Sequence, residues 1–210
     1  MENAGDYRLE RIGSTLYIYL AHSNGKEDWA NNLDFLPVRH KTRLMLSCLS
    51  VPKRAYRAET DEEKGWFAHR GFLRVWKSVE GYIADAVLDP GVKRIVCAGY
   101  SHGAALAVLC HEYVWYHRQD LRDPIEGYGF GCPRVFWGEC SPELAERWKN
   151  FTVIRNLNDP VTHLPPSFLG FTHVGTMLTI GTRGKYSAFD AHRPENIKKE
   201  LSLLEKQTVY

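Results

Sequence analysis

The sequence predicts an α/β fold in which helices cover both faces of a mostly parallel central sheet. Short apolar segments rich in β-branched residues alternate along the chain with longer segments whose apolar residues recur at helical spacing. This alternation is typical of a three-layer α/β domain. A sharp Gly-Tyr-Ser-His-Gly turn at 99–103, between one such strand and one such helix, supports the same fold. No repeat or long linker divides the 210 residues, so we expect one domain over 1–210.

The first half of the chain contains one clear strand and one clear helix. Residues 16–20 read as a buried strand, and a turn at 23–25 precedes an expected short helix over 28–33. Residues 50–66 are charged and irregular, which favours a surface loop. Apolar residues between Phe72 and Val87 recur at helical spacing and predict an amphipathic helix from about 71 to 88.

The second half continues the alternation. The strand 94–98 leads through the sharp turn into a helix that begins near 104. Ser141 and Pro142 have the residue types of an N-cap and a first helical position, so a helix is expected over 141–149. The remaining expected elements are strands over 125–130 and 151–155, a strand or hairpin over 171–180, and a last amphipathic helix marked by Ile197, Leu201 and Leu204.

The composition excludes several classes of function. The formal net charge is +2, with 27 basic and 25 acidic residues, which gives no electrostatic footprint for nucleic acid. The five cysteines are irregularly spaced and no C-x-x-C or H-E-x-x-H occurs, so no metal site or cofactor is expected. An odd cysteine count, with no visible signal peptide or membrane-spanning segment, favours a reduced, cytoplasmic protein. We also expect no obligate protein partner.

Residues 99–103 match the nucleophile elbow, G-x-S-x-G. A serine between a strand and a helix at such a turn projects above the sheet edge, where the helix N-terminus faces it. Ser101 is therefore a candidate nucleophile. The alternative is an ordinary strand-to-helix turn with a serine cap.

A serine nucleophile needs a histidine to take its proton and a carboxylate to orient that histidine. Asp159 directly follows an expected strand, although Asn-Asp-Pro is also a common turn sequence. Among the downstream histidines, His163 lies only four residues after Asp159, and His173 lies in an apolar stretch typical of a structural histidine. His192 lies in a late polar loop, where a catalytic histidine is expected.

Several stretches in order carry a resemblance to a known family. They are Leu16-Tyr17-Ile18, Asp28-Trp29, Asn32-Leu33-Asp34-Phe35, His69-Arg70-Gly71-Phe72, Gly99–Leu106, Phe130-Gly131-Cys132-Pro133-Arg134 and Asn158-Asp159-Pro160-Val161-Thr162-His163-Leu164-Pro165-Pro166. Together they resemble the class 3, or fungal-type, lipases of the α/β-hydrolase superfamily, and especially their short bacterial and phage members. The resemblance covers roughly residues 15–197.

By position, the resemblance implies that Ser101 is the nucleophile, Asp159 the acid and His192 the base. An oxyanion hole requires preorganised donors, and the backbone N–H of His102, after the nucleophile, is one of them. The family's second donor lies six residues before a tryptophan, which gives Ser23; the alternative for Ser23 is a turn serine.

The chain departs from the family pattern near the elbow and in the oxyanion loop. His22 and Ala104 stand where glycines are usual, and His102 replaces a common leucine. The segment that carries the lid in larger relatives is short here. Candidates for an apolar acyl pocket, each equally plausible as core, are Leu33, Phe35, Leu36, Phe168 and Leu169.

These observations predict a serine carboxylester hydrolase that acts through an acyl-enzyme on a small-molecule or lipid ester, without a cofactor. A transient contact with a lipid interface is compatible with this reading. The alternatives are a phospholipase A1-type acyl hydrolase on the same triad, and an inactive hydrolase-fold protein that binds lipid or a protein partner.

Overall fold

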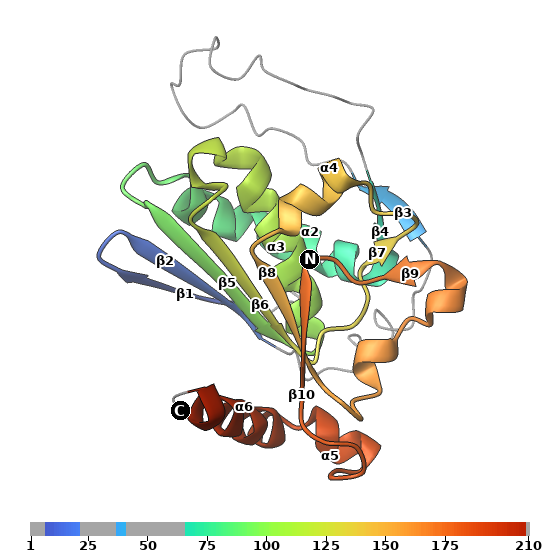
Figure 1. Ribbon diagram of the computed structural model, residues 1–210. Coiled ribbons are helices and arrows are strands. Elements are labelled where there is room, and N and C mark those ends of the chain that lie inside the picture. The colour runs from blue at the N-terminus through green and yellow to red at the C-terminus, as the bar shows by residue number, and fades with distance from the viewer. Residues whose placement is uncertain (1–6, 22–36, 41–65, 209–210) are drawn as a thin grey trace.

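The computed structural model describes residues 7–21, 37–40 and 66–208. Ser23, Leu33, Phe35 and the short helix expected over 28–33 lie outside the described residues, as does most of the expected loop over 50–66. The described residues form a large central sheet, a small second sheet and helices on both sides of the large one (Figure 1).

The central sheet has the strand order β1-β2-β5-β6-β8-β10. Only the edge pair β1–β2 is antiparallel, and every other neighbouring pair is parallel. The strands are β1 (Tyr7–Ile12), β2 (Thr15–Leu20), β5 (Arg94–Tyr100), β6 (Ile125–Phe130), β8 (Phe151–Asn156) and β10 (Thr176–Ile180). The expectation of a mostly parallel sheet is confirmed, and the parallel strands all end at one edge.

Two long helices cover one face of this sheet. The helix α2 (Arg70–Leu88) is amphipathic, and Val75, Val79 and Ile83 lie on its buried side. The helix α3 (His102–His117) is buried over nearly its whole length between α2 and the strands β5 and β6. A helix that is apolar all round is expected in such a central position.

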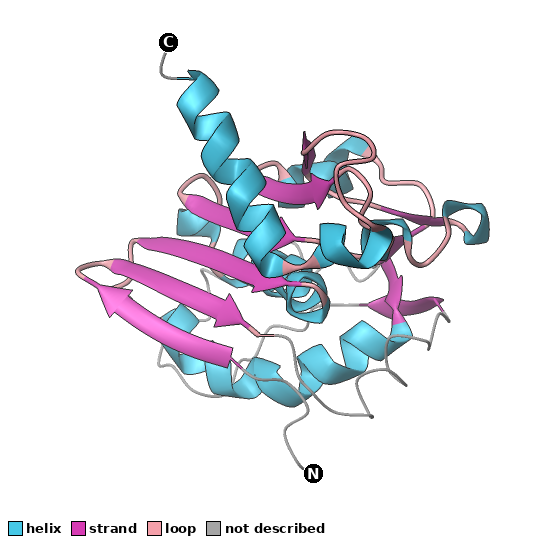
Figure 2. Cartoon of the chain, turned by 90° about the horizontal axis from the view of Figure 1, so that it is seen from below, coloured by secondary structure: helices cyan, strands magenta, loops and turns pink. Residues whose placement is uncertain are grey.

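The opposite face carries α5 (Ala188–His192) and α6 (Pro194–Thr208), which lie across the sheet from α2 and α3 (Figures 1 and 2). Ile197 of α6 packs with Ile154 of β8 and Ile180 of β10 in a separate small cluster. The expected helices on both faces are therefore confirmed.

The second sheet is small and antiparallel, with the order β3-β4-β7-β9. Its strands are β3 (Pro37–His40), β4 (Trp66–His69), β7 (Phe136–Trp137) and β9 (Phe171–Thr172). The remaining short elements are α4 (Pro142–Ala145) and the 3₁₀ turns η1 (Gln119–Leu121), η2 (Glu146–Trp148), η3 (Val161–His163) and η4 (Ser167–Leu169).

Most expected elements are present, with two differences of detail. The helix expected over 141–149 begins as expected, since the Ser141 hydroxyl accepts a hydrogen bond from the Leu144 amide, but it continues from α4 into the 3₁₀ turn η2. The hairpin expected as one option over 171–180 is wrong, because the chain turns at Gly175 (φ 78°) and its two strands, β9 and β10, join different sheets.

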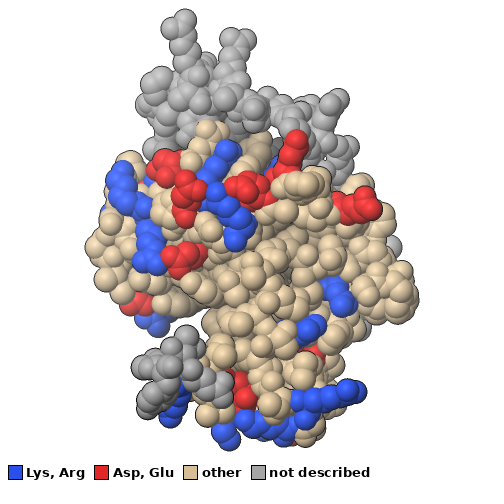
Figure 3. Space-filling view, in the orientation of Figure 1, with Lys and Arg blue, Asp and Glu red and all other residues tan. Residues whose placement is uncertain are grey.

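The surface carries charges of both signs. Figure 3 shows acidic and basic side chains interspersed over the upper part of one face, and basic side chains with fewer acidic ones along its lower edge. Within the described part of the chain, no helix combines the length and the apolar character that crossing a bilayer would require.

Candidate active site

Ser101 occupies a strained turn between β5 and α3. Its backbone has φ 55° and ψ −120°, and within the described ranges it is the one residue other than glycine with a positive φ. Non-glycine residues in this region are held there by their surroundings, commonly at functional sites. The strand hydrogen-bond pattern supplies part of the restraint, because the Ser101 amide donates to the Phe130 carbonyl oxygen at 2.9 Å.

The glycines two residues before and two after Ser101 are required by close packing. A Cβ at Gly99 would lie 2.1 Å from the carbonyl oxygen of Gly103, and a Cβ at Gly103 would lie 2.0 Å from the carbonyl oxygen of Leu20. These obstacles are backbone atoms and cannot rotate away. The two glycines are therefore required by the close approach of β2, β5 and α3. An ordinary capped turn would not require glycine at these positions.

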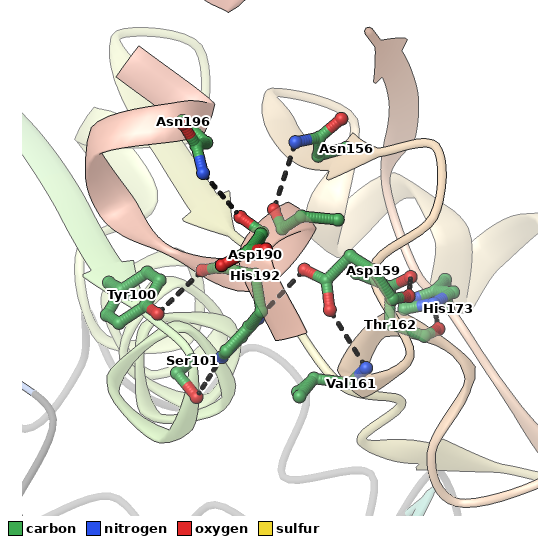
Figure 4. A network of polar contacts seen from close by, with 11 residues as sticks. Tyr100, Ser101, Asn156, Asp159, Val161, Thr162, His173, Asp190, His192 and Asn196 are labelled. Carbon is green, nitrogen blue, oxygen red and sulfur yellow. Dashed lines mark hydrogen bonds and ion pairs between the residues drawn. The ribbon is translucent and has the colours of Figure 1, made fainter. Parts of the chain in front are cut away.

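Asp159 lies in the turn after β8 and is completely buried. Its Oδ1 accepts a hydrogen bond from the Val161 amide at 2.9 Å, and the Thr162 hydroxyl donates to its backbone carbonyl oxygen at 2.9 Å. These contacts are those of the turn that Asn-Asp-Pro predicts. They also leave Oδ2 aimed at the imidazole of His192, so Asp159 serves both the turn and the site (Figure 4).

The expectation that His192 lies in a loop is wrong, because residues 188–192 form the short helix α5, capped by Ser187. His192 is the last residue of this helix, and it joins the other two side chains. Its Nδ1 lies 2.8 Å from Asp159 Oδ2, and its Nε2 lies 2.9 Å from Ser101 Oγ (Figure 4). An ionised carboxylate can only accept, so Nδ1 carries the proton. Nε2 is then the acceptor for the Ser101 hydroxyl, which is the arrangement in which a histidine can remove a serine proton.

The other downstream histidines make different contacts. His173 donates from Nε2 to the Thr162 carbonyl oxygen at 2.8 Å, and burial lowers its pKa to about 4. His163 lies on η3 at the surface, and the loss of part of its hydration, together with the charges of Arg155 and Arg134, lowers its pKa. Neither histidine makes a hydrogen bond to Ser101 or Asp159 through its ring among the contacts of the described residues.

His102 opens α3, and its side chain turns into the core. The ring is buried and packs edge-on against Phe72 of α2, with 5.2 Å between the ring centroids. Its backbone N–H lies at the N-terminus of α3, where the helix dipole and the first amides favour negative charge. This is the position expected for an oxyanion donor after the nucleophile.

Two of the expected pocket residues can be located. Phe168 and Leu169 form the end of η4, where Phe168 is 86% exposed and Leu169 is 45% exposed. The alternative that these two side chains belong to the core is therefore wrong. An acyl-binding role for them stays a prediction.

The site includes contacts that the sequence reasoning missed. Gly131 (φ 57°) follows β6, and a Cβ there would lie 2.9 Å from both Asp159 Oδ2 and His192 Nδ1. The Tyr100 hydroxyl donates to the His192 carbonyl oxygen at 2.7 Å. Glycine directly after a strand was a signal for Gly131, but nothing in the sequence places Tyr100 beside a residue 92 positions away.

Taken together, the site lies at the carboxyl ends of the parallel strands β5 and β8, where ligands bind in open α/β sheets. The arrangement can remove a proton from a serine hydroxyl, hold it on an imidazole and stabilise the resulting charge with a buried carboxylate. It has the geometry of a Ser-His-Asp triad, with the chain order Ser, Asp, His.

Comparison with known proteins identifies the family of the chain. The family model described as "Lipase (class 3)" matches residues 18–169. A lipase of Rhizomucor miehei is 28% identical over 167 residues, which are 77% of this chain and 40% of that protein. Phospholipase A1-IIdelta of Arabidopsis thaliana is 24% identical over 214 residues, covering 90% of this chain and 52% of that protein. The chain thus spans about half the length of these relatives or less.

Solved structures share the fold. A fungal lipase–inhibitor complex superposes with a TM-score of 0.64 at 25% identity, over 85% of this chain and 62% of that one. A triacylglycerol lipase described as having a serine protease triad superposes with a TM-score of 0.60 at 23% identity, over 88% and 67% of the two chains, and shows the fold alone. The protein has the α/β-hydrolase fold, and the match over most of its length makes it a member of the class 3 lipase family.

Proposed function

We propose that this protein is a serine carboxylester hydrolase that cleaves acyl esters through an acyl-enzyme. The observation that carries the proposal is the continuous line of hydrogen bonds from Ser101 Oγ through His192 to Asp159 Oδ2, at 2.9 and 2.8 Å. Such a line supplies the activated nucleophile, the base and the orienting carboxylate that acyl transfer needs.

In the acylation step, His192 Nε2 takes the hydroxyl proton as Ser101 Oγ attacks the ester carbonyl carbon. The tetrahedral oxygen becomes negative, and Asp159 balances the imidazolium that forms beside it. His192 then gives the proton to the leaving alcohol. In deacylation, a water molecule gives a proton to Nε2 as its oxygen attacks the acyl carbon. The bond between that carbon and Ser101 Oγ then breaks, His192 returns the proton to Oγ, and the acid leaves.

The oxyanion would be held by the backbone N–H of His102 and by Ser23. The position of His102 at the N-terminus of the long, buried helix α3 supports the first donor. The second donor rests on the family pattern, since Ser23 lies outside the described residues. No step of this mechanism requires a metal or a cofactor.

A comparison of the wild-type protein with Ser101→Ala on a short-chain p-nitrophenyl ester tests the proposal. The variant should keep the wild-type circular dichroism spectrum and lose turnover by about 10⁴-fold or more, because triad members act as a unit. Ester turnover that survives in the folded variant would reject the assignment, and an inactive wild-type protein would favour the alternative of a lipid- or partner-binding protein.

A phospholipase A1-type activity is the second candidate for the substrate class. It is favoured by the similarity to a phospholipase A1 over 90% of this chain. Release of fatty acid from the sn-1 position of a phosphatidylcholine, measured beside triacylglycerols and p-nitrophenyl esters of several chain lengths, distinguishes the candidates. Faster turnover of the phospholipid would support this candidate, and faster turnover of the acylglycerols or simple esters would support a lipase or esterase.

We also propose a cytoplasmic location, which the composition predicts. The four described cysteines are free thiols, as a reducing compartment would keep them. Fractionation of the native source, with the protein recovered outside the cytosolic fraction as the contrary result, tests this proposal.

A further inference from the structure

The base of a serine hydrolase must be oriented in two respects. A hydrogen bond from Nδ1 to a carboxylate fixes one atom of the imidazole, but the ring can still pivot about that atom. Asp159 Oδ2 fixes Nδ1 of His192 in this way, at 2.8 Å. A second contact is needed to fix the plane of the ring, because Nε2 must point at Ser101 Oγ for proton transfer.

Tyr100 makes contacts of this second kind. Its ring stacks on the imidazole of His192 with a centroid separation of 5.0 Å and an angle of 26° between the planes. Its hydroxyl donates a hydrogen bond to the backbone carbonyl oxygen of the same histidine at 2.7 Å (Figure 4). One side chain thus contacts His192 at both its ring and its backbone.

Tyr100 is also the direct neighbour of the proposed nucleophile in the chain. It is the last residue of β5 and directly precedes Ser101 in the elbow. The strand β6 holds both residues, since Tyr100 pairs with Phe130 and the Ser101 amide donates to the Phe130 carbonyl oxygen. The nucleophile and the surface on which its base stacks therefore belong to one rigid segment.

The backbone that carries His192 is held by two further side chains. The Asn156 amide donates to the Ala191 carbonyl oxygen at 3.0 Å, and the Asn196 amide donates to the Asp190 carbonyl oxygen at 2.8 Å. With Tyr100, these side chains donate to three successive carbonyls at the end of α5, of which that of Asp190 also accepts from the Arg193 amide at 3.2 Å. Tyr100 differs from the two asparagines because it also stacks on the imidazole ring of His192.

We propose that Tyr100 is a positioning residue for His192, in which the stacked ring sets the plane of the imidazole and the hydroxyl anchors its backbone, so that Nε2 stays aimed at Ser101. The inference rests on the proposed function. The aromatic face also favours a cation, and it would stabilise the imidazolium that forms during acyl transfer. Burial raises the pKa of Tyr100 to about 12, so its hydroxyl remains a donor at neutral pH.

The test compares Tyr100→Leu and Tyr100→Phe with the same pair of substitutions at Tyr128. Tyr128 is a matched control because it lies on the neighbouring strand β6 in the same small apolar cluster, while its hydroxyl donates to Glu126 at 2.8 Å. Kinetics on a short p-nitrophenyl ester and the melting temperature are measured for all four variants.

Tyr100→Leu should lower kcat by about 30- to 100-fold with KM changed less than about threefold, since loss of aim affects the chemical step more than binding. Tyr100→Phe keeps the ring and should lose only about three- to tenfold in kcat. The Tyr128 variants should keep kcat within about twofold while losing similar stability. If Tyr100→Leu does not fold, the kcat loss in Tyr100→Phe at an unchanged melting temperature carries the test.

A Tyr100→Leu protein that folds and keeps kcat near the wild-type value would overturn the inference, as would equal losses in both Leu variants. The rate at which a fluorophosphonate modifies Ser101 separates this failure from failure of the proposed function. A reactive wild type with an equally reactive Tyr100→Leu variant rejects only the role of Tyr100. A wild type that neither reacts nor turns over ester rejects the proposed function and this inference with it.

Discussion

Ser101, Asp159 and His192 come from three separate segments, and each is fixed by contacts of its own. The elbow between β5 and α3 holds the serine, the turn after β8 holds the carboxylate, and the end of α5 holds the imidazole. Because contacts outside the triad hold each residue in place, the 2.8 and 2.9 Å contacts between them exist before any substrate binds. Such preorganisation is what proton transfer from a serine requires.

At this scale we predict that His192→Ala loses nearly all ester turnover, while His163→Ala and His173→Ala stay folded and active. The reason is that only His192 places a ring nitrogen within hydrogen-bond reach of Ser101 Oγ among the contacts of the described residues. Steady-state kinetics on a p-nitrophenyl ester, with circular dichroism for folding, gives the result. A His192→Ala protein with near-normal kcat would reject it as the base.

The three proposed triad residues could be singled out from the sequence because each has a local signal and a place in the family pattern. Gly99 and Gly103 flank the serine, Asp159 follows a strand, and His192 lies in a late polar segment. Tyr100 could not be predicted in this way, because its role depends on how α5 packs over the end of β5. Contacts across the fold leave no pattern in a single sequence.

Among the elements, those with a strong apolar period were predicted and the short or amphipathic edge strands were missed. The strand β1 (Tyr7–Ile12) mixes charged and apolar residues at the sheet edge, and β4 and β7 are short strands of the second sheet. By contrast, α2 spans Arg70–Leu88, close to the expected 71–88. Whether such a short strand forms depends on its pairing with other strands, and the local sequence does not indicate that pairing.

The packing of α3 against β2 gives a prediction at the element scale. Gly103→Ala should lower the free energy of unfolding by about 3 kcal/mol or prevent folding, because its Cβ would lie 2.0 Å from the Leu20 carbonyl oxygen. Gly81→Ala in α2 is the matched control, since a Cβ there meets nothing within 4 Å. It should raise stability by about 0.5–1 kcal/mol through helix propensity. Urea unfolding measures both, and equal effects would contradict the packing argument.

For the molecule as a whole, a buried histidine links folding to pH. His111 of α3 is fully buried against Phe151, and burial lowers its pKa to about 3. In the unfolded chain its pKa is about 6.5. Between these two pKa values the unfolded chain binds a proton that the native protein does not. The contribution of neutral His111 to the free energy of unfolding is therefore complete above the unfolded pKa and declines as the pH falls below it.

The urea midpoint of the wild-type protein should therefore fall between pH 7 and pH 5, and His111→Leu should reduce that fall. Each chain is compared with itself at the two pH values, so any change in packing cancels. His173, whose pKa burial lowers to about 4, acts in the same direction and accounts for part of the slope that remains. An unchanged pH dependence in His111→Leu would show that His111 does not contribute to the loss of stability at low pH.

The central claim, that Ser101 is a nucleophile activated by His192, is tested most directly by covalent labelling with a fluorophosphonate followed by mass spectrometry. We predict one phosphonyl group per chain, located on the peptide that contains Ser101, with labelling abolished in Ser101→Ala and slowed by orders of magnitude in His192→Ala. No labelling of the folded wild-type protein, labelling at another residue, or an undiminished rate in His192→Ala would contradict the account.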